Sequence, residues 1–391
     1  CDWSSDVCSS DLVWLQYEIS GVYMRLSRLM MMMLAMLAIG MIAAACSSDE
    51  DEEVDSGDAG EVVASSDTLK TVLDRGKVIV GVKDSQPGFG NLNPDGTFAG
   101  QDVEYAHAIA AALFGDKSKV EFVVASAATR FELLSAEEID VLIRTTTWTS
   151  SRDIDLSSSF TATTFYDGQG IIVNADSAIN SINDLEGATI CVTTGTTTEV
   201  NLANGLAAAG VNYTALTLAG DAEINEAFIA GRCEAWTGDK GNLAGQRSSF
   251  PAAEGGPESL RVLPETLSKE PLGPVVRDGD TDWYDVVQWV VFGTMAADEL
   301  GVNSGNVVAM AANPPTKDIA NLLGASFGGA EPSNFGTSLG LSPTFMQSVI
   351  GQVGNYDEIY ERTIAPIGLA REGSLNASWL DGGLIYSPPI K

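Results

Sequence analysis

Alternating blocks of strand-type and helix-type hydrophobic patterning begin at residue 77 of this chain. Short aliphatic runs typical of buried strands are separated by stretches in which apolar residues recur every three or four positions, as on amphipathic helices. The first block predicts strands at 77–83, 120–125 and 139–144, and helices at 102–114 and 129–136. This order of elements indicates a mostly parallel sheet covered by helices.

A second block with the same organisation follows. It predicts a strand at 188–194, a helix from about Thr197, a helix at 222–231 and a strand at 233–238. A long helical pattern then covers 283–300, and helices punctuated by glycine and proline follow it. Two α/β units in tandem, each of ordinary domain size, predict an α/β protein with two lobes and a ligand cleft between them.

The N-terminal part of the chain does not share this patterning. Residues 1–23 begin with "CDWSSDVCSSDL" and differ in character from everything downstream, so we interpret them as a non-native segment. Residues 24–45 start with Arg25 and Arg28 and continue as an unbroken apolar run that ends in small residues. This pattern predicts an export signal, with an uncleaved membrane anchor as the alternative.

Cys46 directly follows the sequence "AAA". This arrangement resembles the bacterial lipobox, in which the cysteine is acylated and becomes the mature N-terminus, although Ala43 stands where the pattern has leucine. Residues 46–68 are acidic and poor in bulky apolar side chains, so we expect a solvated tether after a lipid anchor.

Composition excludes several classes of function. The 391 residues carry 53 acidic against 21 basic side chains, a formal net charge of −32, which repels nucleic acid and anionic membrane surfaces. His107 is the single histidine and lies in an apolar helical stretch, where a structural role is expected. The sequence therefore supplies almost no residues for a zinc site or for histidine-dependent nucleophilic catalysis. We expect no metal and no cofactor.

The five cysteines leave one candidate disulfide. Cys1 and Cys8 fall in the segment interpreted as non-native, and Cys46 is the candidate for acylation. Cys191 and Cys233 remain, each beside a predicted strand in a protein expected to be exported. A disulfide between them is favoured. Two unpaired buried thiols are the alternative.

Polar side chains gather where predicted strands end. The strand "IDVLI" is followed by Thr145, Thr147 and Arg152, and the strand "ATICVTT" leads through a glycine into Thr196 and Thr197 at a helix start. Ligands of open α/β sheets bind outside the carboxyl ends of the strands. Arginine offers a planar fork that matches a carboxylate, and helix N-termini bind anions through free N–H groups.

Asp239 also comes just after a strand, in "CEAWTGDKGN". An aspartate in this position often caps the following helix, and that is the simpler interpretation. An arginine and helix N–H groups for a carboxylate, together with an aspartate for an ammonium group, would nevertheless suit the two charges of a free amino acid.

Several stretches together carry a resemblance to a known family. They include "DVLIRTTTWTSSRD", "ICVTTGTTTEVNLA", "GRCEAWTGDKGNL" and the terminal "GGLIYSPP". From about Leu69 to its end, the chain resembles the extracytoplasmic solute-binding proteins of amino-acid ABC importers, in the general L-amino-acid subfamily. The resemblance implies the bilobed type II fold of periplasmic binding proteins, with lobe 1 at 69–167 and 276–391, lobe 2 at 168–275, and flexible connections near 165–170 and 271–275.

The resemblance also implies roles for particular residues. Arg152 would hold the ligand carboxylate, assisted by Thr147, the backbone at Thr145 and the helix start at Thr197, and Asp239 would bind the α-ammonium group.

Two further positions, Lys83 and Gln101, would help line the side-chain pocket. Gln101 stands in "GQDVE" where the family pattern has an aromatic residue, and Lys83 lies with Gln86 in a loop where relatives vary.

The implied function is that of a monomeric, non-enzymatic receptor in the periplasm or at the outer face of the cytoplasmic membrane. It would close around a free L-amino acid and deliver it to ABC permease subunits. The alternative is a cyclic-acid dehydratase of the arogenate or prephenate type on the same fold. For that alternative Lys269 and Glu270 would offer an acid–base pair, but we interpret them as surface charges of the connection between the lobes.

Overall fold

The computed structural model of the protein describes residues 67–391. The expected non-native segment, the export signal, Cys46 and nearly all of the acidic tether lie outside the described residues.

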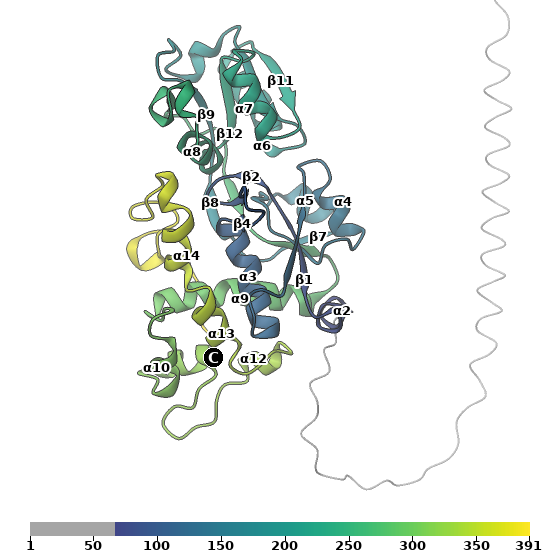
Figure 1. Ribbon diagram of the computed structural model, residues 1–391, viewed down its shortest axis with the longest axis vertical. Helices are drawn as coiled ribbons and strands as arrows, with labels where there is room; N and C mark the ends of the chain where they lie inside the picture. Colours follow the sequence, from purple (N-terminus) through teal and green to yellow (C-terminus); the bar gives the residue numbers. More distant parts are fainter. Residues whose placement is uncertain (1–66) are drawn as a thin grey trace, which may run out of the picture. The chain divides into compact units, whose positions relative to one another are not determined.

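Two five-stranded sheets organise the described residues (Figure 1). The first has the order β5-β1-β6-β15-β7, in which β1 runs parallel to β5 and β6, while β15 runs antiparallel to β6 and β7. Its strands are β1 (Val78–Val82), β5 (Val120–Val124), β6 (Val141–Leu142), β7 (Ser158–Phe160) and β15 (Val275–Arg277). The predicted β-α-β-α-β order is present, with α3 (Gln101–Phe114) and α4 (Arg130–Ser135) as its helices.

The second sheet has the order β11-β10-β12-β9-β13. Here β10 runs parallel to β11 and β12, and β9 runs antiparallel to β12 and β13. The strands are β9 (Gln169–Asn174), β10 (Thr189–Thr193), β11 (Thr214–Leu218), β12 (Ala235–Asp239) and β13 (Leu260–Val262), and the helices are α6 (Thr197–Ala209), α7 (Asp221–Ile229) and α8 (Lys240–Ser248).

The chain passes between the two sheets at 165–170 and 270–275. In this region β8 (Phe165–Asp167) and β14 (Glu270–Leu272) form a separate antiparallel pair. In each sheet one strand runs opposite to the others, β15 in the first sheet and β9 in the second, and each begins at the end of a crossing. The hydrophobic pattern did not indicate these reversed strands. The fold is the type II periplasmic-binding-protein fold, with a sheet in each lobe.

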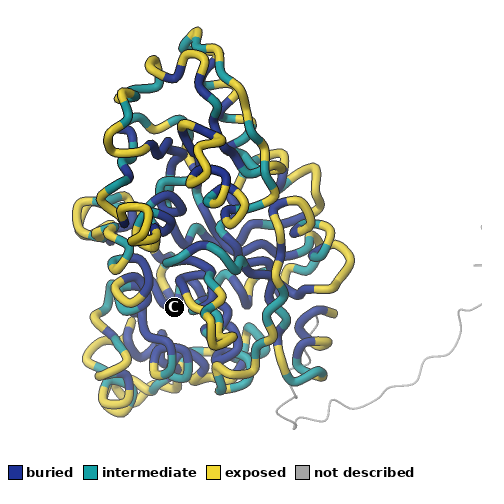
Figure 2. Tube along the Cα trace, turned by 45° about the horizontal axis from the view of Figure 1, so that its top comes forward, coloured by how far each residue is buried: buried dark blue, intermediate teal, exposed yellow. Residues whose placement is uncertain are grey.

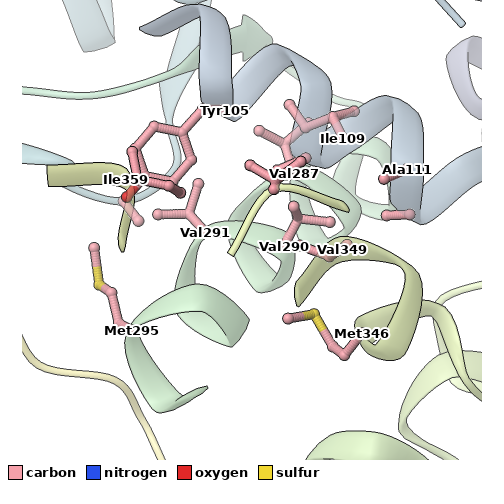
Figure 3. Close-up of a cluster of buried hydrophobic side chains, with 14 of the residues drawn as sticks. Tyr105, Ile109, Ala111, Val287, Val290, Val291, Met295, Met346, Val349 and Ile359 are labelled. Carbon is pink, nitrogen blue, oxygen red and sulfur yellow. The ribbon is translucent and has the colours of Figure 1, made fainter. Parts of the chain in front are cut away.

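The largest core lies around α3 and α9 (Thr281–Glu299). Helix α3 is rich in alanine and buried on nearly all sides, which is the pattern of an internal helix. Its Tyr105 and Ile109 point toward Val287 and Val291 of α9, and Val349 lies beside them (Figure 3). Figure 2 colours the chain by burial and shows buried positions in the middle of the protein and exposed positions at the turns.

The C-terminal segment contributes to this core. It contains α10 (Val307–Ala312), α11 (Lys317–Leu323), α12 (Phe335–Ser338), α13 (Phe345–Gln352) and α14 (Tyr356–Thr363). Where α13 packs against α9, a Cβ atom on Gly293 would lie 2.5 Å from the sulfur of Met346, so a larger residue there would require the methionine side chain to move. The segment is therefore an integral part of the first lobe and not an appendage.

Cys191 and Cys233 form a disulfide inside the second lobe, with Cα atoms 5.7 Å apart. Cys191 lies on β10, and Cys233 precedes the neighbouring strand β12. Both are buried in the core that contains Trp236, and the alternative of two free thiols does not hold.

We predict that Val349→Ala lowers the free energy of unfolding by about 2 kcal/mol or more, because it deletes two fully buried methyl groups where α13 meets α3 and α9. Chemical denaturation followed by circular dichroism would measure the change. The control is Val308→Ala on α10, where valine is 80% exposed and a change within about 0.5 kcal/mol is expected. Equal effects of the two substitutions would contradict an integral role of this segment in the core.

Candidate functional site

A polar cavity lies where the ends of strands from both sheets meet. The volume available to the centres of water-sized molecules is ≈ 50 Å³, which exceeds what a single water needs and leaves room for a small molecule. Its lining consists of Lys83, Gln86, Arg130, Arg144, Thr145, Thr147, Arg152, Thr193, Thr196, Thr197, Thr198, Asp221, Gly238, Asp239 and Asn242.

All the ligand-binding residues predicted from the sequence line this cavity except Gln101. The prediction for Gln101 was wrong: its side chain is fully buried, and its Nε2 donates to the carbonyl of Thr164 at 3.2 Å. As the first residue of α3, Gln101 is turned toward Thr164, which directly precedes β8 and whose carbonyl also accepts from the Tyr356 hydroxyl at 3.0 Å.

Arg152 sits on the short helix α5 (Ser150–Asp155), whose N-cap Thr149 accepts a hydrogen bond from the Arg152 amide. The guanidinium donates through Nη1 to the carbonyl of Thr147 at 2.9 Å and faces the ring of Phe131. Burial lowers the pKa of Arg152 to about 10, against the opposing effect of Glu270 and Asp239, so the group stays charged at neutral pH. It makes no ion pair with any residue in 67–391 and can receive an anion.

The start of α6 brings the second lobe to the same place. Thr196 is the N-cap, and its hydroxyl accepts from the Glu199 amide. The hydroxyl of Thr197 lies 3.4 Å from that of Thr147 and donates to Glu270 at 2.9 Å. Hydroxyls from both lobes therefore meet beside Arg152, close to the positive end of a helix dipole.

Thr145 has an unusual backbone conformation that depends on a residue the sequence did not reveal. Its φ of 47° is uncommon for a residue with a β-branched side chain. The amide of Thr145 donates to Asp102 at 2.8 Å, and its hydroxyl donates to Gln86 at 3.1 Å. Asp102, at the N-terminus of α3, therefore helps to hold a strained strand end, a feature that often occurs at binding sites.

Asp239 occupies the N-cap position of α8 but caps nothing with its side chain. Its Oδ1 is buried without a hydrogen-bond partner among the described residues, so the capping interpretation was wrong. Burial, together with the carboxylates of Asp167 and Glu270, raises the pKa of Asp239 well above its usual value, while Lys83 and Arg152 oppose this. An unpaired carboxyl group facing a polar cavity is suited to a cationic partner.

Two arginines in the lining were missed by the sequence analysis. Arg130 and Arg144 are only 2% and 6% exposed, and the Nε of each has no hydrogen-bond partner in the described part of the chain. Burial lowers the pKa of Arg130, and repulsion by the guanidiniums of Arg144 and Arg152 lowers it further. The place of Arg144 in the lining could have been inferred, because it directly precedes Thr145. Nothing in the sequence around Arg130 indicated that it lines the cavity.

Glu270 is a further correction, because it was expected to be a surface charge. It is 1% exposed and accepts hydrogen bonds from Thr197, from Asn201 at 2.8 Å, and from Ser268. Lys269 is exposed. Glu270 is thus a buried hydrogen-bond acceptor on the connecting strand β14. The sequence around it did not indicate this burial.

Among residues 67–391, no group of three or more histidine, cysteine, aspartate or glutamate side chains could hold a metal ion. Within the same range, no helix combines the length and the apolar character that crossing a membrane requires.

The model of the bacterial extracellular solute-binding proteins, family 3, matches residues 78–301. This chain belongs to that family. The family assignment gives no support to the dehydratase alternative.

Several similar proteins cover more than four fifths of this chain. The glutamate/glutamine/aspartate/asparagine-binding protein BztA of Rhodobacter capsulatus is 42% identical over 84% of this chain and 94% of its own length. The general L-amino acid-binding periplasmic protein AapJ of Rhizobium johnstonii is 41% identical over 85% of this chain and 95% of its own. An ABC transporter periplasmic binding protein from Brucella ovis, solved with glutathione bound, is 42% identical with a TM-score of 0.78, over 83% and 99% of the two chains.

We predict a pH dependence of stability from Asp102. Burial raises its pKa from 3.8 to about 7, with the Thr145 amide, Arg144 and Lys83 opposing. Between about pH 4 and 7 the folded protein keeps a proton that the unfolded chain releases, so this group lowers the free energy of unfolding as pH rises through that window. About three pKa units at roughly 1.4 kcal/mol each give a loss of the order of 4 kcal/mol.

Asp102→Asn removes the titration and keeps an oxygen that can accept from the Thr145 amide. The expected result is that the variant gains stability over the parent from pH 4 to about pH 7 and that the difference levels off by pH 8, measured by urea denaturation across that range. A difference between parent and variant that does not change with pH would contradict a buried, titrating Asp102.

Proposed function

We propose that this receptor binds the zwitterion of a free L-amino acid in the cavity and closes around it. The observation that carries the proposal is the presence, in the lining of one small cavity, of Arg152, which makes no ion pair within residues 67–391, and of Asp239, whose Oδ1 has no hydrogen-bond partner there.

The ligand carboxylate would be held at the Arg152 end. A guanidinium, the hydroxyls of Thr147 and Thr197, and the free amides at the start of α6 converge there from two lobes. Charge-assisted hydrogen bonds contribute about 1.5–3 kcal/mol each. Four or five of them, set against several kcal/mol for association, correspond to binding that is about micromolar or tighter.

The α-ammonium group would be held by Asp239. Its neighbouring carboxylates favour the protonated form in the empty cavity, and a bound ammonium group would restore the ionised form by supplying the missing positive charge.

The ligand side chain would meet Arg130 and Arg144. Two buried guanidiniums without an ion-pair partner favour a side chain that carries a carboxylate or a carbonyl oxygen. The names of the two relatives agree in part, because BztA is named for glutamate, glutamine, aspartate and asparagine, and AapJ for L-amino acids in general.

Closure would join the lobes through these ligand contacts and present one surface to the ABC permease subunits. Export through residues 24–45, acylation of Cys46 and a monomeric state complete the proposal, with the first two resting on the sequence pattern alone. The buried Cys191–Cys233 disulfide is consistent with an oxidising, extracytoplasmic compartment.

We predict that Arg152→Ala and Asp239→Asn each weaken amino-acid binding by about a hundredfold, because each leaves one charge of the zwitterion unpaired in a buried site. Isothermal titration calorimetry of the purified protein with L-glutamate and L-glutamine would measure this. Arg247→Ala is a matched control on the second lobe, because Arg247 pairs with Glu258 at the surface. If all three variants bind like the parent, the amino acid binds elsewhere.

We further predict that Arg144→Gln weakens L-glutamate binding at least about tenfold more than L-alanine binding, because only glutamate brings a second carboxylate to this end of the cavity. Competition calorimetry would give the ratio of the two affinities. An equal loss for both amino acids would show that Arg144 supports the fold of the cleft rather than the ligand side chain.

A further inference from the structure

A buried ion pair joins the two lobes inside the same cavity. Lys83 follows β1 of the first sheet, and Asp221 opens α7 of the second lobe. Their side chains are only 12% and 1% exposed, and both residues line the cavity. Close by, Gln246 of α8 donates to the carbonyl of Ser85 at 2.7 Å, a second contact between the lobes.

Each charge of the pair is also held from its own lobe. Lys83 Nζ donates to Gln86 at 2.9 Å, and Asp221 Oδ1 accepts from Asn242 at 3.0 Å. The position of Asp221 in the first turn of α7 places its negative charge at the favourable end of the helix dipole. Both side chains are thus fixed in direction before they meet, as expected for a pair that shapes a pocket.

Hydrogen bonds connect the pair to the segment that carries Arg144. Gln86 Oε1 accepts from Lys83 Nζ at 2.9 Å and from the hydroxyl of Thr145, the residue after Arg144, at 3.1 Å. The charge of Asp221 also acts on Arg144. The pair is therefore adjacent to the end of the cavity proposed for the ligand side chain.

We propose that Lys83 and Asp221 are a specificity-determining pair that sets the net charge met by the ligand side chain. This inference rests on the proposed amino-acid-binding function. While the two are paired, Asp221 is occupied and cannot receive the ammonium or guanidinium group of a basic side chain. The charge that remains beside the pair is then the guanidinium of Arg144, and Arg130 adds a second one to the same lining, so the cavity accepts neutral and anionic side chains and rejects cationic ones.

The pair also limits how strongly anionic side chains are preferred. Asp221 compensates Lys83 and its charge also acts on Arg144, so it offsets part of the positive charge that a ligand carboxylate would meet. Removing either partner leaves a single unpaired charge in a buried site, where one unit charge changes the affinity for an oppositely charged group by more than about tenfold.

The test compares L-glutamate, L-glutamine and L-lysine by calorimetry in the parent, Asp221→Asn, Lys83→Met and the double variant. The affinity ratio of glutamate to glutamine is expected to rise at least about tenfold in Asp221→Asn and to fall at least about tenfold in Lys83→Met. Lysine, rejected by the parent, is expected to bind Lys83→Met. In the double variant the ratio is expected to return to within about threefold of the parent value.

A ratio is used because any cost to closure or folding affects both ligands alike. The matched control is Lys70→Met, which breaks an exposed lysine–aspartate pair with Asp74 on the surface and is expected to leave the ratio unchanged. Circular dichroism would confirm that each variant is folded. Lys83→Met removes the more exposed partner, so it decides the question if Asp221→Asn does not fold.

The inference is overturned if the ratio in the folded single variants stays within about threefold of the parent while glutamine still binds. It is also overturned if the double variant deviates from the parent as far as a single variant does. Failure of the parent to bind any of the three amino acids would instead refute the proposed function itself.

Discussion

The structure depends on one electrostatic constraint: the cavity is lined by buried guanidiniums that make no ion pair among the described residues. Arg130, Arg144 and Arg152 have lost most of their contact with water, and Oδ1 of Asp239 has no hydrogen-bond partner among the described residues. Buried charges without partners are costly. In the proposed function, a ligand of opposite charge would remove this cost, and closure would thereby be linked to occupancy.

Other residues around the cavity hold its lining groups in position. Asp102 holds the strained strand end at Thr145, so that Thr145, Thr147 and Arg152 leave β6 in the correct direction. Glu270 holds Thr197 at the start of α6. In both cases a buried carboxylate fixes a backbone or hydroxyl group beside the cavity without lining it. Support of this kind orients the binding groups before the ligand arrives, which reduces the ordering cost of binding.

The sequence predicted the fold and the strand ends well, because period-two and helical patterning identify buried strands and their covering helices directly. Thr145, Thr147, Arg152, Thr197 and Asp239 could be found because the carboxyl ends of parallel strands meet at one edge of a sheet. Gln101 was misplaced and Arg130 was missed because the direction of a side chain at the start of a helix depends on tertiary packing. The burial of Glu270 was missed for a related reason: its partners are remote in sequence and belong to another element.

The connecting strand β14 ties the two halves of the site together. Pro271 accepts from the Trp148 amide at 2.8 Å, and Leu272 bridges to Thr147, so the strand is bonded to the segment that carries the first-lobe grip. Glu270, the first residue of β14, is hydrogen-bonded to Thr197 and Asn201 of α6 in the second lobe. One short strand is therefore hydrogen-bonded both to the Thr147 segment of the first lobe and to the start of α6 in the second. The 3.4 Å approach of the Thr147 and Thr197 hydroxyls depends on this shared strand, because it holds both groups from one side.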